Sequence, residues 1–456
     1  MVLGIMRLLR VLEELKKDKE LVEIEEEVEA EDITYISREL DEGPALLFSN
    51  VKGRRMPILT NLCNKRERLM KLMHVRSEEE LYEKLLRASE SPRKGEYVDL
   101  TSASFTWRKR EGSLSDIPVF KYYPRDAGPY ITSGIVVAKS PRKGIQNASI
   151  HRMLLLDEDK LAIRIVPRHL WRIYREAMEE GHDLPVAILI GVHPAILVAA
   201  ASSPPYGIDE MLVANALLEG GLKFVKLPES GISVPTDVEI LIEGRITKEE
   251  SYEGPFVDLL DIYDIRRKQP VIVVDRVWIS KNAIYHAIVP ASTEHKLLMG
   301  LYREALIWDN VRNVVPKVHK VRLTRGSGGW LHAFISIEKS SEGDGKNAIM
   351  AAFAAHPSLK AVVVVDGDVD VDDLDQVEWA IATRFQPSRD LVLIKCARGS
   401  SLDPSADQDN LLTDKIGIDA TRTFLKPASI FERVKISPSE RGLMIVRRLK
   451  EGHVSE

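Results

Sequence analysis

The chain of 456 residues is long enough for two or three domains, and its composition, 44% hydrophobic and 29% charged, is that of a globular protein. Its net charge of -5 argues against general binding to nucleic acid, and no apolar run reaches the roughly 18 residues of a membrane span. Two cysteines, Cys63 and Cys396, exclude a disulfide framework and are typical of small buried side chains in a reducing compartment, so we expect a cytoplasmic protein.

The first 115 residues predict an N-terminal α/β portion. Apolar residues at helical spacing predict a helix over 5–18, and two further helices are expected over 66–73 and 78–86. The apolar run 44–48 predicts a strand. Residues 87–115 are polar and rich in breakers, which favours a loop or linker.

The middle of the chain, residues 116–315, is dominated by strand signals. β-Branched runs bounded by Gly, Pro or Asp predict strands, and two segments between them predict helices. The expected strands are 130–137, 161–166, 234–243 and 271–275, and the expected helices are 169–180 and 209–219. Many strands with few helices predict a barrel-like or sandwich β unit with helices attached.

The last third, residues 320–456, alternates strands and helices and predicts a smaller α/β domain. It contains Asp366, Asp368, Asp370 and Asp372 at alternate positions, as a calcium loop would. Such a loop needs Gly at its sixth position and Glu at its twelfth, where this chain has Val371 and Val377. An acidic strand–helix loop is therefore the favoured interpretation.

Three polar segments carry a mixed set of nitrogen and oxygen donors. They are 146–152, 166–169 and 202–210. Asn147, His169 and Glu210 are plausible ligands for Mn2+ or Mg2+, and Arg152 supplies a cation for a carboxylate or phosphate. Such residues scattered over some sixty positions also occur for structural reasons, so this pattern alone leaves the metal open.

A fourth segment, Glu253-Gly-Pro-Phe-Val-Asp258, places two carboxyl groups on either side of a stiff turn. Neighbouring carboxyl groups tend to split their pKa values, which suits acid/base chemistry, and a cation such as Arg152 could keep one of them ionised. A turn with two solvated acids is the alternative that the segment alone leaves open.

Taken in order, these segments resemble the UbiD family of decarboxylases, and the resemblance covers nearly the whole chain. Further matching segments are 43–53, 61–68, 131–137, 234–240, 379–384 and 414–421. The resemblance implies an α/β (α+β) fold in three parts: an N-terminal α/β portion over 1–115, a split β-barrel-like cofactor domain over 116–315, and a C-terminal α/β oligomerisation domain over 320–456.

The resemblance also implies roles for individual residues. Arg152, Glu253 and Asp258 match the catalytic network, and Asn147, His169 and Glu210 match the metal ligands. Positions that match the binding site of the cofactor are Asn147, Ser149, Ile150, Arg152, Arg168, His169, Ser202, Ser203, Glu210 and Lys415. The implied cofactors are prenylated FMN and Mn2+ (or Mg2+), with K+ as a further candidate ion. Lys415 is expected in a loop that reaches the cofactor phosphate.

Finally, the resemblance implies removal of CO2 from an α,β-unsaturated acid, with Asp258 as proton donor where many members have Glu. His151 and Arg168 stand where aromatic-acid enzymes often carry small or neutral residues, which favours a more anionic substrate. The favoured substrate is trans-anhydromevalonate 5-phosphate, which UbiD-like enzymes of the archaeal mevalonate route convert to isopentenyl phosphate. A 4-hydroxybenzoate-type aromatic acid, a non-catalytic flavin-binding subunit and a flavin-independent metal lyase are the alternatives. A flavin prenyltransferase as cofactor supplier and a homodimer or higher homo-oligomer are expected, and neither nucleic acid nor a membrane is.

Overall fold

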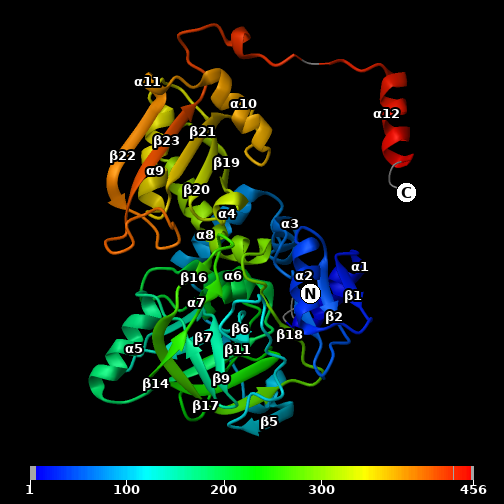
Figure 1. Ribbon diagram of the computed structural model, residues 1–456, viewed down its shortest axis with the longest axis vertical. Helices are drawn as coiled ribbons and strands as arrows, with labels where there is room; N and C mark the ends of the chain where they lie inside the picture. Colours follow the sequence, from blue (N-terminus) through cyan, green and yellow to red (C-terminus); the bar gives the residue numbers. More distant parts are fainter. Residues whose placement is uncertain (1–6, 435, 453–456) are drawn as a thin grey trace.

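The computed structural model describes residues 7–434 and 436–452. Figure 1 shows three mixed α/β parts: a blue N-terminal part, a large cyan and green sheet, and a yellow and orange C-terminal part. Helix α8 (Thr293–Val311) lies where they meet and packs against α4 (Glu78–Glu90), α6 (Pro194–Ser202) and α9 (Asp344–Ala355). In the described portion of the chain, no helix is both long and apolar enough to span a bilayer.

The N-terminal part is a small sheet flanked by helices. Its elements are α1 (Leu8–Lys17), β1 (Leu21–Ile24), α2 (Ala30–Glu39), β2 (Ala45–Phe48), β3 (Ile58–Thr60), α3 (Arg66–Leu72) and α4. The predicted first helix is confirmed over Leu8–Lys17, where Leu8, Val11, Leu12 and Leu15 are buried at helical spacing. The sheet order is β1-β2-β3-β18, so β18 (Tyr285–His286) ties this part to the middle of the chain.

The middle part is built on one nine-stranded sheet. Its strands are β5 (Arg108–Glu111), β6 (Tyr130–Ile131), β7 (Ile135–Lys139), β8 (Gln146–Ile150), β9 (Met153–Asp157), β10 (Lys160–Ile163), β11 (Leu184–Ile190), β14 (Ile240–Glu253) and β17 (Arg267–Ile279). Helices α5 (His169–Glu180), α6 and α7 (Glu210–Leu217) belong to the same part, with a two-stranded ribbon of β15 (Phe256–Val257) and β16 (Tyr263–Asp264).

The order of this sheet explains its shape. It runs β6-β9-β10-β17-β14-β11-β7-β8, with β5 beside β17. Strands β8 and β9 lie near opposite ends of that order, yet only His151 and Arg152 separate them in the chain. Because two residues span only a few ångströms, the sheet must curl until its edges approach each other. No described strand pairing closes the gap, so the sheet is an open, split barrel, and Arg152 lies at the split.

The polar segment 87–115 is not a free linker, contrary to the prediction. Strand β4 (Glu96–Tyr97) pairs with β12 (Lys223–Lys226), which also pairs with β13 (Ser233–Pro235), and β5 pairs with β17. Two short 3-10 helices, Leu100–Ser102 and Ser104–Trp107, connect β4 to β5. The polar composition was misleading because strands at sheet edges expose most of their side chains to water.

The C-terminal part has a five-stranded sheet in the order β19-β20-β21-β23-β22. Its elements are β19 (Lys317–Leu323), β20 (His332–Glu338), α9, β21 (Ala361–Asp366), α10 (Leu374–Arg384), α11 (Pro387–Asp390), β22 (Leu391–Arg398) and β23 (Leu412–Ala420), with a 3-10 turn at Arg325–Ser327. The sequence pattern predicts a buried strand over Ala361–Asp366 and a helix over Leu374–Arg384, and both are confirmed. Cys396 is exposed, so the expectation that both cysteines are buried is wrong for this one.

The alternating aspartates after β21 pair with basic side chains. Arg384 binds Asp366 at 2.6 Å and Asp368 at 2.8 Å, and Lys320 lies 3.0 Å from Asp370 and 2.8 Å from Asp372. These pairs neutralise the carboxylates with protein cations, which agrees with an acidic loop rather than a calcium site.

Beyond β23 the chain leaves the body of the molecule. A 3-10 turn (Ala428–Phe431) precedes α12 (Glu440–Gly452), which Figure 1 shows well separated from the rest of the chain. The large apolar side chains of this arm that lie exposed are Phe424, Leu425, Ile430, Val434, Ile436, Leu443, Met444, Ile445, Val446 and Leu449.

Candidate functional site

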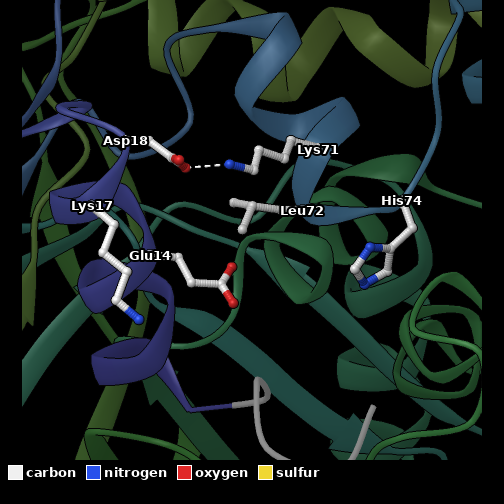
Figure 2. Close-up of a pocket in the computed structure, with 6 residues that line it drawn as sticks. All are labelled: Glu14, Lys17, Asp18, Lys71, Leu72 and His74. Atoms are coloured by element: carbon white, nitrogen blue, oxygen red, sulfur yellow. Dashed lines mark hydrogen bonds and ion pairs between the residues drawn. The ribbon is translucent and has the colours of Figure 1, made fainter. Parts of the chain in front are cut away.

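Two surface hollows lie away from every residue that the sequence singled out. The first hollow, of about 310 Å³, is lined by residues of α1 and α3 and by His74. Figure 2 shows the Asp18 carboxylate paired with Lys71, with Glu14, Lys17 and His74 lining the same hollow. The second, of about 550 Å³, is lined mainly by α4 and its flanks. Solvated side chains of both charge signs line the two hollows. The predicted catalytic residues lie instead at the split of the nine-stranded sheet.

There the predicted catalytic residues come together around one guanidinium. Arg152 binds Glu253 through two hydrogen bonds, from Nε to Oε1 at 2.8 Å and from Nη2 to Oε2 at 3.0 Å. Its Nη1 lies 3.4 Å from Oδ2 of Asp258, and its Nη2 lies 2.8 Å from Oδ2 of Asp264. Arg152 therefore fixes three carboxylates that come from the end of β14, the loop after β15 and the end of β16.

Local backbone geometry aims these acids. Gly254 has φ 86°, and a Cβ there would meet the carbonyl oxygen of Ile265 at 2.9 Å, so only glycine fits without strain. The Tyr130 hydroxyl donates to Glu253 at 3.1 Å and accepts from the Gly254 amide at 3.1 Å. Glu253 is fully buried, whereas the Asp258 side chain is 27% exposed and can meet a ligand.

Electrostatics separates the roles of these groups. Burial alone would lower the pKa of Arg152, but its pairing with Glu253, Asp258 and Asp264 raises that pKa above its usual value. Burial alone would likewise raise the pKa of Asp264, yet Arg152 and Arg267 hold it below its usual value. The arginine thus stays charged, and Asp264 stays ionised near neutral pH.

His295, at the start of α8, also faces this network. Burial lowers the pKa of His295, and the Asp258 carboxylate opposes that effect. Its Nδ1 accepts a hydrogen bond from the Ala291 amide at 3.2 Å, so its Nε2 carries the proton of a neutral ring. A neutral donor beside Asp258 suits the binding of an acidic ligand.

The three predicted metal ligands also come together. Glu210, the first residue of α7, accepts from Nδ2 of Asn147 and from the Ala148 amide on β8, both at 2.7 Å. Nδ1 of His169, the first residue of α5, lies 3.9 Å from Oε1 of Glu210. Glu210 is 1% exposed, and no described Lys or Arg pairs with it. A buried carboxylate with an imidazole and an amide, and no cationic side chain, is a donor set that fits a divalent cation.

Further predicted cofactor positions come from β8 and from the ends of α5 and α6. Ser149 is bonded to Nε2 of His151 at 2.9 Å, and Ile150 follows it on β8. Ser202 ends α6 with its hydroxyl on the Ala199 carbonyl, and Ser203 caps that helix with φ 51°. Arg168 is the residue before α5, so the strand β8 and the ends of three helices surround one region.

Lys415 lies in strand β23, so the prediction that it lies in a loop is wrong. It pairs opposite Ile394 on β22, and its buried Nζ donates to the carbonyls of Pro357 at 2.6 Å and Leu359 at 2.5 Å. Burial lowers the pKa of Lys415 to about 8. An ammonium has three protons, so one remains for a further acceptor.

Several residues of the site had not been found by sequence reasoning. Asp264, Tyr130 and His295 contact or face the Arg152 network, and Arg164 and Arg267 share the Asp264 carboxylate at 3.8 Å and 2.7 Å. No spacing marks them, because they come from separate strands and from α8. The adjacent basic residues Arg266 and Arg267, two positions after Asp264, were the only available hint.

Comparison with known proteins identifies the family of this chain. Family models described as the N-terminal, Rift-related and C-terminal domains of 3-octaprenyl-4-hydroxybenzoate carboxy-lyase (UbiD) match residues 12–89, 97–293 and 296–420. The anhydromevalonate phosphate decarboxylase of Aeropyrum pernix is 50% identical over 380 residues, 83% of this chain and 85% of that protein. The protein of that name from Methanothermobacter thermautotrophicus is 46% identical over 393 residues, 86% and 91% of the two chains.

Solved structures show the same similarity. The UbiD-class enzyme HmfF of Pelotomaculum thermopropionicum, in complex with FMN, superposes with a TM-score of 0.91 at 39% identity and covers 94% of this chain and 97% of that one. An evolved dimeric form of HmfF in complex with prenylated FMN gives a TM-score of 0.87 at 38% identity, with the same coverage. With three family models spanning most of its length, the chain belongs to the UbiD family of decarboxylases.

Proposed function

We propose that this decarboxylase uses prenylated FMN to convert trans-anhydromevalonate 5-phosphate to isopentenyl phosphate. Relatives named anhydromevalonate phosphate decarboxylase support the substrate, and a neighbour in complex with prenylated FMN supports the cofactor. The observation that carries the chemistry is the Arg152 guanidinium, which binds Glu253, Asp258 and Asp264 at the open edge of the sheet.

Each side chain of the network has a task in this proposal. When bound, prenylated FMN supplies the electron sink for the electrons released as the bond to CO2 breaks. Arg152 orients the substrate carboxylate, and Glu253, fully buried and bidentate, holds Arg152 in place. Asp258, whose side chain is partly exposed, acts as the acid that delivers a proton to the carbon that has lost CO2.

We propose that Asn147, His169 and Glu210 hold Mn2+ (or Mg2+) and that this ion anchors the phosphate of the cofactor. The support is the buried Glu210 carboxylate, which no described lysine or arginine neutralises. The flavin would be lined by Ser149, Ile150, Ser202 and Ser203. The Lys415 ammonium would donate its third N–H in a hydrogen bond to the cofactor phosphate. No observation on the described residues favours a separate K+ site.

The test is to produce the protein together with a flavin prenyltransferase and to offer it acids of several classes. We expect a modified flavin spectrum, and release of CO2 and isopentenyl phosphate from trans-anhydromevalonate 5-phosphate. Turnover of 4-hydroxybenzoate instead would refute the substrate, and bound flavin without turnover of any acid would support a non-catalytic subunit. Activity that persists without flavin would point to a metal lyase.

We further propose that the chain self-associates through its C-terminal part. The arm after β23 exposes a row of apolar side chains, and the edge strand β22 and its neighbour β23 expose Leu391, Leu393, Leu412 and Ile416. Such surfaces are unusual on a monomer and are complementary in character, so the arm of one copy can cover the sheet of another. Ending the chain at Arg433 should lower the mass measured by analytical ultracentrifugation at micromolar concentration. A full-length chain that sediments as a monomer would contradict this.

A further inference from the structure

A group of basic side chains comes from the residue before α5, from α8 and from the C-terminal part. The Arg303 guanidinium on α8 lies 5.8 Å from the centre of the Trp330 ring, and Trp330 packs edge-on against His356 at 4.4 Å. Lys415 donates to the carbonyl of Pro357, the residue after His356. Burial, together with the positive charges of Arg303, Lys415 and Arg168, lowers the pKa of His356 to about 3. Contacts through Trp330 and Pro357 thus make Arg303, His356 and Lys415 neighbours, and the charge of Arg168 acts on the same histidine, although the four residues come from distant segments.

Within the described residues, no carboxylate balances this group. Arg168, Arg303 and Lys415 take part in no ion pair, and the two guanidinium groups donate no hydrogen bond to the protein. Two other arginines differ from these, because Arg152 and Arg384 each bind at least two carboxylates. Cations that gather without counter-charge repel one another, and a bound anion removes that cost. The fork of an arginine matches the oxygens of a phosphate particularly well.

Helix α8 connects this group to the reacting centre. His295, whose pKa is affected by Asp258, is eight residues before Arg303 on the same helix. Eight residues of α-helix rise about 12 Å and turn the side chain by about 80°, so both residues project from one side of α8. A ligand whose acidic end meets Asp258 can thus present a second anionic group toward Arg303.

Two phosphates could occupy such a site, that of the substrate and that of the cofactor. Lys415 is already held by two carbonyls and has one proton left, whereas all five N–H donors of Arg303 are unused by the described residues. His151 is a poor candidate for phosphate binding, since both of its ring nitrogens are hydrogen-bonded within the protein and burial lowers its pKa to about 4. Arg303 therefore offers a phosphate more free N–H donors than Lys415 or His151 does.

We propose that Arg303, assisted by Arg168, binds the phosphate monoester at the far end of the unsaturated acid and so selects phosphorylated substrates. This inference rests on the proposed function. It assigns Arg303 to substrate binding, separate from Lys415 and the metal trio, which we assign to the cofactor phosphate.

The test compares the holoenzyme with its Arg303→Gln and Arg303→Lys variants. Arg312→Gln is the matched control, because Arg312 caps the other end of α8 and pairs with Asp309 at 2.6 Å. We expect Arg303→Gln to raise KM for the phosphorylated acid by about 10- to 100-fold, the worth of a charged hydrogen bond. The preference over the non-phosphorylated acid should fall by the same factor, with kcat changing much less and the flavin content staying full. Arg303→Lys should recover part of the loss, and Arg312→Gln should behave as the wild type.

Other outcomes would overturn the proposal. Loss of flavin from Arg303→Gln with an unchanged KM would assign the arginine to the cofactor phosphate, and an unchanged KM with full flavin would leave it without either role. Binding of inorganic phosphate can be measured without turnover, so it distinguishes failure of this inference from failure of the proposed function. If the wild type decarboxylates only unphosphorylated acids but binds phosphate more tightly than Arg303→Gln does, the anion site stands and the substrate is wrong. Equal phosphate binding by the two proteins refutes the site itself.

Discussion

Replacing Asp258 by Asn separates proton delivery from structure. The Asp258 carboxylate lies 3.4 Å from Arg152 and its side chain is 27% exposed, which makes this the longest of the arginine's three pairings. An ion pair of that kind is worth about 0–1 kcal/mol, so the free energy of unfolding should change by less than about 1 kcal/mol. Asn also has nearly the same size, and Glu253 and Asp264 still hold Arg152.

Catalysis should respond quite differently. An amide cannot deliver the proton, so turnover should fall by about 10²- to 10⁴-fold, which corresponds to about 3–5 kcal/mol of barrier. The assay is CO2 release under single turnover, with the flavin spectrum and thermal unfolding measured on the same sample. Asp258→Asn and Glu253→Gln should not add when combined, because both residues serve one network. Near-normal turnover by Asp258→Asn with full flavin would refute its role as proton donor.

Three further changes test the rest of the site. Glu253→Gln breaks a fully buried bidentate pair, so it should lower the free energy of unfolding by about 3 kcal/mol as well as activity, and an unchanged melting curve would contradict this. Glu210→Gln should lower bound metal and bound flavin together when both are measured on the purified protein, and full metal content would show that the ligand assignment is wrong. The pKa of Asp264 is depressed in the folded chain, so its stabilising contribution exists above the unfolded pKa of about 3.9 and is lost as pH falls through the lower folded value. Chemical denaturation should therefore show a constant difference between wild type and Asp264→Asn above about pH 5 that shrinks below about pH 4.

The sequence by itself determined several strands and helices of the C-terminal part and the identity of the Arg152, Glu253 and Asp258 network. Strands and helices with strong periodicity, such as Ala361–Asp366 and Leu374–Arg384, were predicted because local burial and spacing decide them. The catalytic acids were found because a stiff Gly-Pro turn holds them close together in the chain, and because the order of the motifs resembles a known family.

Only the tertiary structure decided which distant residues complete the site. Asp264 and His295 reach the Arg152 network through the pairing of β15 with β16 and the docking of α8, and no local pattern encodes either contact. Lys415 was assigned to a loop because its polar neighbours in 412–420 alternate with apolar residues only weakly, whereas pairing with β21 on one side and β22 on the other makes the segment a strand. The unpaired charge of Arg303 likewise becomes evident only in the folded chain, where separate segments bring basic side chains together without a carboxylate. Ion pairing depends on distances in space and not on positions along the chain.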